Sequence, residues 1–477
     1  MASSSRTRFR RQIRDFVVVW AGITFIVGAA TFIAIYITYG NLPDGGPGGR
    51  LSSVALPTAT VAVAPTATFT LVPTVDLGSP TPTQPEPTPT PLVATAVSQA
   101  ATALPTDPPP TATPRLLDDQ RFQLGVQVQV SYDNMAQWLD VAANQLSVNW
   151  VKQQVRWADI APAPGEFDWF YLDTYVPAAQ AQGLQVLASV VTAPDWARDE
   201  GVELSRHGPP ADPQDYADFV VAMLQRYPGA IHAVEVWNEQ NLDREWTAAN
   251  GLIAADYVEL LRTTYAAVKA VDPDVIVISG ALSPTGLSDG VRAWDDFAYM
   301  DQMIEAGLLE ATDCVGAHHN GINVSPEYTW DMIPDDPTIQ FTGPYDTPHH
   351  SWSFRSTLQT YANKVALAGG SQRLCVTEFG WPSAEGLDGI PEGFGFALDN
   401  TLEEQRDYTV MALDLMREWD TVWIAILWNL NYGPQAGWAA DNDNVPYSII
   451  GPGFVFRPVF DAVRDWNRAY EATFAAS

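Results

Sequence analysis

The sequence predicts an α/β fold in which residues 116–477 form a (β/α)8 TIM barrel. Apolar runs of strand length alternate with amphipathic helical stretches in eight successive units, and most of the runs are continuously apolar rather than apolar at every second residue. Continuously apolar runs are typical of parallel strands that are buried on both faces. Eight strand-helix units indicate a closed barrel, because a doubly wound sheet usually has about five or six strands.

The elements of the barrel follow one another in a regular order. We expect strands, each an apolar run, at residues 122–130, 150–157, 184–191, 231–237, 275–282, 314–319, 373–379 and 422–430. We expect helices between and after them at residues 135–146, 170–183, 215–227, 256–271, 295–307, 353–370, 403–419 and 455–470. No GxGxxG motif follows a strand and no P-loop is present, so the sequence argues against a nucleotide-binding enzyme.

A basic tail and an apolar segment stand at the start of the chain. Residues 1–15 contain five Arg, and the 24 residues 16–39 carry no charge. As a helix this segment would extend about 36 Å, which is enough to cross a bilayer core of about 30 Å. The positive-inside rule then places the tail in the cytoplasm and the barrel outside the cell. A cleaved signal peptide is the alternative, but the apolar run exceeds the usual length of about 7–15 residues and no A-x-A-like site follows it promptly.

Residues 40–115 are rich in Pro, Thr, Ala and Val, as in the stretch SPTPTQPEPTPTP. Frequent Pro removes backbone donors and favours polyproline II, and no core can form from such a composition. The sequence therefore predicts a disordered stalk between a transmembrane helix at residues 16–39 and a catalytic domain at residues 116–477. The expected protein is single-pass in the cell membrane, with the lipid bilayer as one partner.

The charges are distributed unevenly along the chain. The sequence has 25 Lys plus Arg against 56 Asp plus Glu, a net charge of -31. Residues 1–50 have a net charge of +4, residues 51–115 of -2 and residues 116–477 of -33. A nucleic-acid partner is excluded because phosphate neutralisation needs clustered basic residues. The field of the acidic domain would also repel a strongly anionic polymer, so we expect a neutral substrate.

Polar and aromatic side chains stand at the ends of several predicted strands, where a barrel of this type carries its chemistry. They are Arg156, Asn238, Glu239, His318, Glu378 and Trp428. Cleavage of a glycosidic bond requires one carboxyl group to protonate the leaving oxygen and another to attack or to activate water. Two Glu with amide, imidazole, guanidinium and indole groups around them fit that chemistry, and no metal or cofactor is expected.

The motifs around these residues resemble those of clan A glycoside hydrolases, in detail most of all the cellulase-type barrels of families 39 and 5. The resemblance covers residues 116–470 and is most specific at WNEQN (237–241) and TEFGW (377–381). It implies that Glu239 is the general acid/base and Glu378 the nucleophile of a retaining mechanism. It also implies carboxyl groups about 5 to 5.5 Å apart.

Supporting roles follow from the same chemistry. We expect Asn238 to donate to the sugar 2-hydroxyl, and Arg156 to hold Glu378 ionised. An aromatic, partly desolvated wall is expected to raise the pKa of Glu239. Trp428 is a candidate platform under the sugar, and Trp381 and Trp196 are candidates further along the cleft, although each can also serve as packing at the barrel rim.

The sequence departs from the family pattern at the sixth strand. Relatives often have His-x-Tyr there, whereas this chain has His318, His319 and Asn320, so the Tyr that commonly bonds the nucleophile is missing. We expect His318 to keep a role in the site. A zinc site at the two His is not expected, because adjacent side chains on a strand diverge.

The sequence leaves some alternatives open. Cys314 and Cys375 are expected to be buried free thiols, since adjacent parallel strands rarely offer disulfide geometry, although a bridge is conceivable outside the cell. An inactive carbohydrate-binding barrel and a transglycosylase that uses the same intermediate are the alternatives to a hydrolase. Sugar and linkage, endo or exo action and oligomeric state do not follow from these motifs.

Overall fold

The computed structural model of the chain describes residues 121–334 and 348–475. The predicted cytoplasmic tail, the transmembrane helix at residues 16–39 and the linker up to residue 115 lie outside these residues. In the part of the chain that the structure describes, no helix is both long and apolar enough to cross a membrane.

Eight parallel strands form one sheet in the order β5-β4-β3-β2-β1-β8-β7-β6. Their bounds are β1 Gln123–Gln127, β2 Trp150–Arg156, β3 Gln185–Val191, β4 Ala233–Val236, β5 Ile276–Ser279, β6 Val315–Asn320, β7 Leu374–Gly380 and β8 Val422–Leu427. The edge strands β5 and β6 meet through two isolated parallel bridges, Ile278 with Cys314 and Leu282 with Ala317. The sheet is thus a nearly closed barrel, as the eight continuous apolar runs predict.

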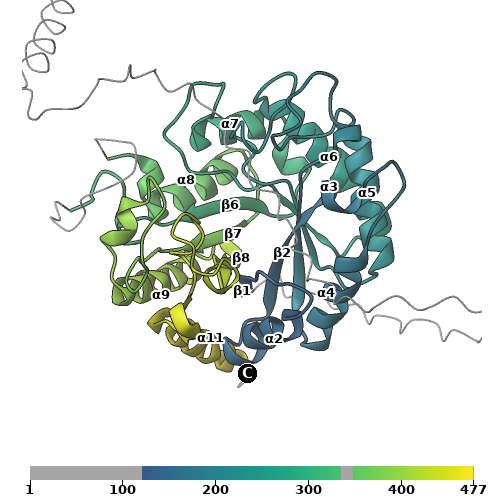
Figure 1. Cartoon of the computed structure of the whole chain (residues 1–477). Coiled ribbons are helices and arrows are strands. Elements are labelled where there is room, and N and C mark those ends of the chain that lie inside the picture. Colours follow the sequence, from purple (N-terminus) through teal and green to yellow (C-terminus); the bar gives the residue numbers. More distant parts are fainter. Residues whose placement is uncertain (1–120, 335–347, 476–477) are drawn as a thin grey trace, which may run out of the picture. The chain divides into compact units, whose positions relative to one another are not determined.

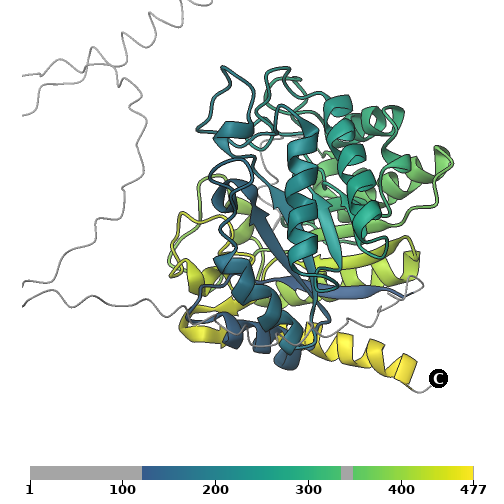
Figure 2. The same cartoon turned by 90° about the vertical axis from the view of Figure 1, so that its right-hand side faces the viewer.

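Helices surround the strands, as the view along the barrel in Figure 1 shows. Their bounds are α2 Met135–Asp140, α3 Trp157–Ile160, α4 Phe170–Ala181, α5 Pro213–Arg226, α6 Ala254–Val271, α7 Asp296–Glu305, α8 Phe354–Leu367, α9 Leu402–Trp419, α10 Tyr432–Gln435 and α11 Pro458–Ala475. The last helix, α11, packs against α9 and is the yellow helix near the C-terminus in Figure 2.

Local sequence signals account for several helix boundaries. Asp212 caps α5 by accepting a hydrogen bond from Gln214 N–H, and Pro213 occupies the first turn, where its missing N–H costs nothing. Thr401 and Glu404 form a reciprocal capping box at the start of α9. The helix predicted at residues 135–146 is α2 followed by a π-helical turn at Val141–Gln145.

The final helix begins later than predicted. Residues 455–456 form strand β10 (Val455–Phe456), which pairs with β9 (Ile450–Gly451). The helix α11 then starts at Pro458, a residue favoured in a first helical turn. The apolar residues at 455–456 therefore belong to a short hairpin rather than to the helix.

Two apolar layers hold the barrel together. The larger one lies between the strands and the surrounding helices, and the smaller one fills the barrel interior with side chains from successive strands, including Trp150, Leu187, Ile278, Cys375 and Ile424. Strands buried on both faces require both layers, which explains why the runs are continuously apolar.

The prediction of free thiols is wrong. Cys314 and Cys375 form a disulfide, with Cα atoms 5.8 Å apart. Cys314 directly precedes β6, and Val315 pairs with Arg373 and Leu374 at the start of β7. The two Cys are therefore diagonal neighbours across the ladder, and both point into the barrel interior. The prediction assumed that adjacent parallel strands do not offer disulfide geometry, whereas this diagonal placement brings the Cα atoms within the usual range of about 4.4–6.8 Å.

Candidate active site

Glu378 and Glu239 both lie at the carboxyl-terminal end of the barrel strands. Glu378 is part of β7, and Glu239 stands three residues after the end of β4. The chain leaves β4 through two residues in the left-handed region, Trp237 with φ 74° and Glu239 with φ 47°. Such conformations are unfavourable for non-glycine residues and persist at sites where the surroundings enforce them. Trp237 Nε1–H donates to Glu245 O, and Glu239 N–H donates to Ala281 O, so both ends of this turn are held.

A buried lysine joins two carboxylates below the barrel mouth. Lys152 Nζ, on β2, lies 3.0 Å from Glu378 Oε1 and 3.3 Å from Glu235 Oε2, on β4. Thr377 donates its hydroxyl to Glu235 Oε1. Lys152 and Glu235 are fully enclosed, so the charge of each depends on the other, because an unpaired buried charge is costly.

Asn320 makes a hydrogen bond to Glu378 from the strand on which the Tyr of the family pattern is missing. Its Nδ2 donates to Glu378 Oε2 over 3.1 Å. The pairing of β6 with β7 shifts between Ala317 and His318, and His318 is then paired with Glu378. Irregularities of this kind re-aim side chains near functional sites. Both carboxylate oxygens of Glu378 thus have a donor.

His318 lies between the two candidate catalytic carboxylates. Its Nδ1 is 3.3 Å from Glu239 Oε1 and its Nε2 is 3.8 Å from Glu378 Oε1. On the solvent side, Arg244 places a guanidinium nitrogen 3.0 Å from Glu239 Oε2. Glu239 therefore has positive or protonatable partners on both oxygens.

These contacts shift the pKa values of the buried groups in a consistent way. Burial lowers the pKa of Lys152, but the charges of Glu235 and Glu378 outweigh it and raise the pKa above its ordinary value. Burial also lowers the pKa of His318, while the charge of Glu378 and the hydrogen bond to Glu239 raise it, and the net direction is upward. His318 therefore holds a proton next to Glu239 at pH values where an ordinary His has lost it.

The prediction of a raised pKa for Glu239 is wrong for the free protein. Burial does raise its pKa, but the hydrogen bond and charge of His318, together with the charge of Arg244, lower it to about 2. Burial acts in the predicted direction, yet the partners His318 and Arg244 outweigh it. His318, whose pKa is raised, is therefore the more strongly basic of the two groups in the free protein.

Arg156 does not hold Glu378, contrary to the prediction. It is the last residue of β2, its side chain is 43% exposed and it pairs with Asp159 at 3.3 Å. Lys152, four residues earlier on the same strand, is the cation that contacts Glu378. Arg156 instead lines a cavity of about 430 Å³ together with Gln153, Tyr171 and Tyr432.

Asn238 directly precedes Glu239, and Trp428 N–H donates to Phe379 O, next to Glu378. Asn238 is buried, and its Oδ1 has no hydrogen-bond partner among the described residues. Trp428 is half-buried after β8, with its ring 5.2 Å from that of Tyr432. Gly380 permits this arrangement, because a Cβ there would meet the Trp428 carbonyl oxygen at 2.4 Å. The negative charge of Glu378 contributes to raising the pKa of Tyr432 to about 12, after burial, so this ring is also close to Glu378.

The other two Trp, Trp381 and Trp196, both make packing contacts. Trp381 is 1% exposed, packs against Phe354 and donates its indole N–H to Val324 O, so the prediction that it contacts substrate is wrong. Trp196 is half-buried, and its indole N–H donates to Ala161 O while its edge meets Trp157. One part of Trp196 stays exposed, and its contact with substrate remains a prediction.

His319 points away from the site, as the divergence of adjacent strand residues requires. It is buried against Phe354, and burial lowers its pKa to about 4. The imidazole is therefore neutral at ordinary pH and belongs to the layer between β6 and α8.

Reasoning from the sequence missed four residues of this site: Lys152, Glu235, Arg244 and Asn320. A signal existed for the first two, since a charged residue inside a continuously apolar strand must find a partner when the strand is buried. Arg244 and Asn320 carry no comparable signal, because their contacts depend on loop and register geometry.

Comparisons with known proteins agree with the fold. No protein-family model matches the sequence, and no curated protein matches it. A family 39 glycoside hydrolase from the gut symbiont Bacteroides cellulosilyticus superposes with a TM-score of 0.53 at 18% identity, over 74% of this chain and 65% of its own. The chain thus spans less than two thirds of that enzyme.

Two further solved structures give similar values. A GH39 enzyme from Xanthomonas axonopodis pv. citri has a TM-score of 0.51 at 15% identity, over 73% of this chain and 67% of its own. A glucosidase from Croceicoccus marinus has a TM-score of 0.51 at 14% identity, over 74% and 68%. At these identities the likeness concerns the fold, and the structures that share the barrel of this chain are glycoside hydrolases of the clan that its motifs resemble.

Proposed function

We propose that the protein is a retaining glycoside hydrolase that cleaves β-glycosidic bonds in polysaccharide or oligosaccharide. The observation that carries the proposal is the placement of Glu239 and Glu378 on either side of His318 at the mouth of the barrel. The two carboxylates differ in their partners, as an acid/base and a nucleophile must.

In the first step Glu378 attacks the anomeric carbon, and the bond from that carbon to the glycosidic oxygen breaks. Lys152 and Asn320 hold the two oxygens of Glu378 and orient it for attack. The leaving oxygen takes a proton from Glu239, which receives it from His318 over the 3.3 Å contact. Entry of the sugar displaces the exposed Arg244 from Glu239, which removes one of the charges that keep this carboxyl ionised.

In the second step Glu239 acts as a base. It takes a proton from a water molecule, the water oxygen bonds to the anomeric carbon, and the ester bond to Glu378 breaks. Two inversions at the same carbon retain its configuration. The free enzyme is restored when the proton on Glu239 returns to His318.

The surroundings suggest how a sugar is held. Asn238 provides a buried amide for the 2-hydroxyl, and the half-buried Trp428 provides an aromatic face. The cavity lined by Arg156, Gln153 and Tyr171 offers polar contacts for a further sugar unit. The net charge of -33 over residues 116–477 favours a neutral glycan.

We also infer that the enzyme works outside the cell on a membrane anchor. The support is the uncharged segment 16–39 after a basic tail, followed by the stalk up to residue 115. The full chain is expected to stay in washed membranes during carbonate extraction. Release into the supernatant would contradict the anchor.

The activity can be tested with the purified chain on a panel of neutral polysaccharides and aryl β-glycosides. We expect hydrolysis of at least one substrate, with the β-anomer as the first-formed product in a time course by NMR. An α-anomer would contradict retention. Binding without hydrolysis would indicate an inactive carbohydrate-binding barrel, and product that requires an added sugar acceptor would indicate a transglycosylase.

The role of His318 predicts a change in pH dependence. In the His318→Gln variant the proton for the leaving group must be held by Glu239 alone, next to Arg244, so we expect the alkaline limb of the kcat/KM profile to move to lower pH. His319→Gln, on the same strand but outside the site, is the control and should leave the limb unchanged. An alkaline limb that stays in place in His318→Gln would show that another group supplies the proton.

A further inference from the structure

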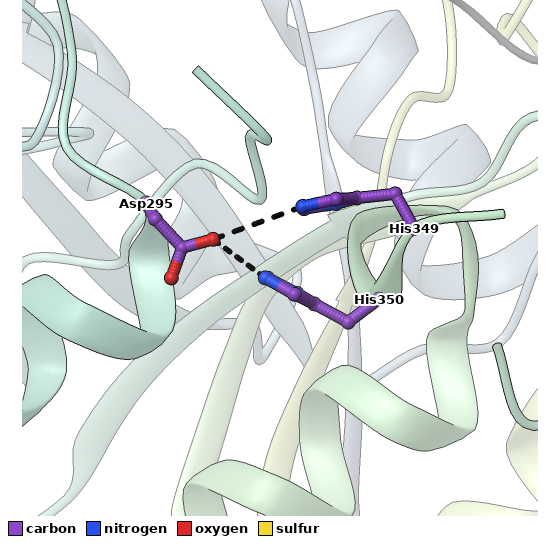
Figure 3. Close-up of side chains that lie close together, drawn as sticks. All are labelled: Asp295, His349 and His350. Carbon is purple, nitrogen blue, oxygen red and sulfur yellow. Dashed lines mark hydrogen bonds and ion pairs between the residues drawn. The ribbon is translucent and has the colours of Figure 1, made fainter. Parts of the chain in front are cut away.

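Asp295, His349 and His350 bring three metal-binding side chains together outside the proposed catalytic site. Figure 3 shows Asp295 at the start of α7 and the two imidazoles opposite it, from the chain just before α8. One donor atom from each of the three residues lies within 4.8 Å of the others. The three side chains are between 14% and 27% exposed, so solvent and ions can reach them.

The orientation of Asp295 is set by the helix that it begins. Its Oδ1 accepts the N–H of Ala298 as the N-cap of α7, which leaves Oδ2 to face the histidines. This Oδ2 lies 2.6 Å from His350 Nε2 and 4.0 Å from His349 Nε2. The carboxylate is therefore held in place before any ligand arrives.

A second carboxylate faces the other side of His350. Its Nδ1 is 3.8 Å from Oδ1 of the fully buried Asp296, which accepts hydrogen bonds from Tyr361 OH and Thr285 N–H. The ring of Phe297 stacks on the imidazole with centroids 3.7 Å apart and fixes its plane. Carboxylate oxygens thus face both nitrogens of this imidazole, Asp295 at 2.6 Å from Nε2 and Asp296 at 3.8 Å from Nδ1.

We propose that Asp295 Oδ2, His349 Nε2 and His350 Nε2 bind a divalent transition metal of the zinc class, with water as a fourth ligand. Imidazole and carboxylate donors suit this class, and a carboxylate behind a ligating imidazole is a usual supporting contact, which Asp296 would supply by closing the 3.8 Å separation from His350 Nδ1. Tetrahedral donors about 2.0–2.1 Å from zinc lie about 3.3 Å from one another. The distances of 2.6 and 4.0 Å reach this value by shifts of less than about 1 Å.

His349 can adopt the tautomer that this site needs. Its Nδ1 lies 2.9 Å from Ser351 Oγ, which can accept a proton from it when Nε2 binds the metal. The same Nδ1 is 3.2 Å from Ser351 N, so metal binding exchanges one hydrogen bond for another at this residue.

The role of the ion is structural. Trp294, which precedes Asp295, exchanges backbone and side-chain hydrogen bonds with Asn241, two residues after Glu239. The metal would join the start of α7 to the chain before α8 and thereby support the turn that carries Glu239. Its binding adds stability to the folded state by mass action.

The proposal can be tested on the full chain after removal of metal with a chelator. Titration with Co²⁺, a spectroscopic substitute for Zn²⁺, is expected to give a visible d–d band that saturates at one equivalent and disappears when Zn²⁺ is added. We expect Asp295→Asn and His350→Ala each to weaken Co²⁺ binding by more than about 100-fold, since even loss of a supporting partner costs about 10- to 100-fold.

His207→Ala is the matched control, because His207 also pairs with a carboxylate, Glu245 at 3.3 Å, but has no second His beside it. It should bind Co²⁺ as the unaltered chain does. X-ray absorption of the Zn-loaded chain should show two imidazole ligands, and this measurement does not depend on any variant folding. No saturable band, a band that survives in both Asp295→Asn and His350→Ala, or a zinc environment without imidazoles would overturn the proposal.

Discussion

Replacement of Glu378 by Gln is expected to reduce hydrolysis on the order of 10⁴- to 10⁶-fold, because the amide cannot form the glycosyl-enzyme ester. Gln keeps the size of the side chain, its carbonyl oxygen can accept from Lys152, and its NH2 group can donate to Asn320 Oδ1 once that amide turns over, so the loss should be chemical rather than structural. Steady-state rates on the best substrate of the panel measure the effect. Circular dichroism of the variant confirms that the barrel is intact.

The Glu239→Gln variant tests the role of the second carboxylate independently of that of Glu378. A missing general acid costs about 10²- to 10⁴-fold for a sugar leaving group, and less for an activated aryl leaving group that departs without a proton. The ratio of the rate loss with a sugar leaving group to the rate loss with an activated aryl leaving group therefore shows whether Glu239 is the acid. Glu245→Gln is the control, since Glu245 pairs with Arg244 and His207 close to the site but does not contact Glu378 or His318. Full activity in both Glu378→Gln and Glu239→Gln would refute the assigned pair.

Replacement of Lys152 by Met is expected to lower the free energy of unfolding by about 3–5 kcal/mol, because it leaves buried carboxylates without their cation. Lys152 is 1% exposed and contacts both Glu235 and Glu378. Urea unfolding at pH 7 measures the loss. Lys364→Met, which removes a pair with the exposed Asp301, is the matched control and should cost no more than about 1 kcal/mol.

The effect of Lys152→Met should depend on pH. Burial raises the pKa of Glu235, but the charges of Lys152 and His318 bring it below its ordinary value. The ionised carboxylate therefore stabilises the folded chain at pH values above the ordinary pKa, and this contribution is lost as the pH falls through the lowered pKa of the folded state. Without Lys152 the buried carboxylate takes up a proton more readily, and the difference between the two proteins should shrink toward acidic pH. Adding Glu235→Gln to the Lys152→Met variant should restore part of the stability. Equal destabilisation at all pH values, without rescue, would contradict the charge pairing.

Much of the fold follows from local sequence patterns. Each of the eight strands lies within its predicted run or within one residue of it, because a continuously apolar stretch can be buried only where both faces of a sheet are covered. The general position of the catalytic residues follows as well, since strand ends converge at one mouth in a barrel. Glu239, Glu378 and His318 could therefore be proposed together.

The partners of these residues could not be read in the same way. Lys152 reaches Glu378 across 226 positions of sequence, and the alignment of β6 with β7 changes by one residue at Ala317. A one-residue change in register decides which side chains face the interior. Arg156, which has the more obvious charge, ends β2 and lines a cavity near the surface, while Lys152, four residues earlier on the same strand, lies deeper in the barrel and holds the carboxylate.

The sequence by itself determined the order of the elements, the barrel class and the strand ends at which the chemistry gathers, because these depend on hydrophobic period and on chain order. Only the tertiary structure decided the charge state of Glu239, the disulfide between Cys314 and Cys375 and the convergence of Asp295 with His350. These features depend on distances of a few Å between segments remote in the chain. Coulombic and hydrogen-bond energies change over such distances, and a linear pattern does not contain them.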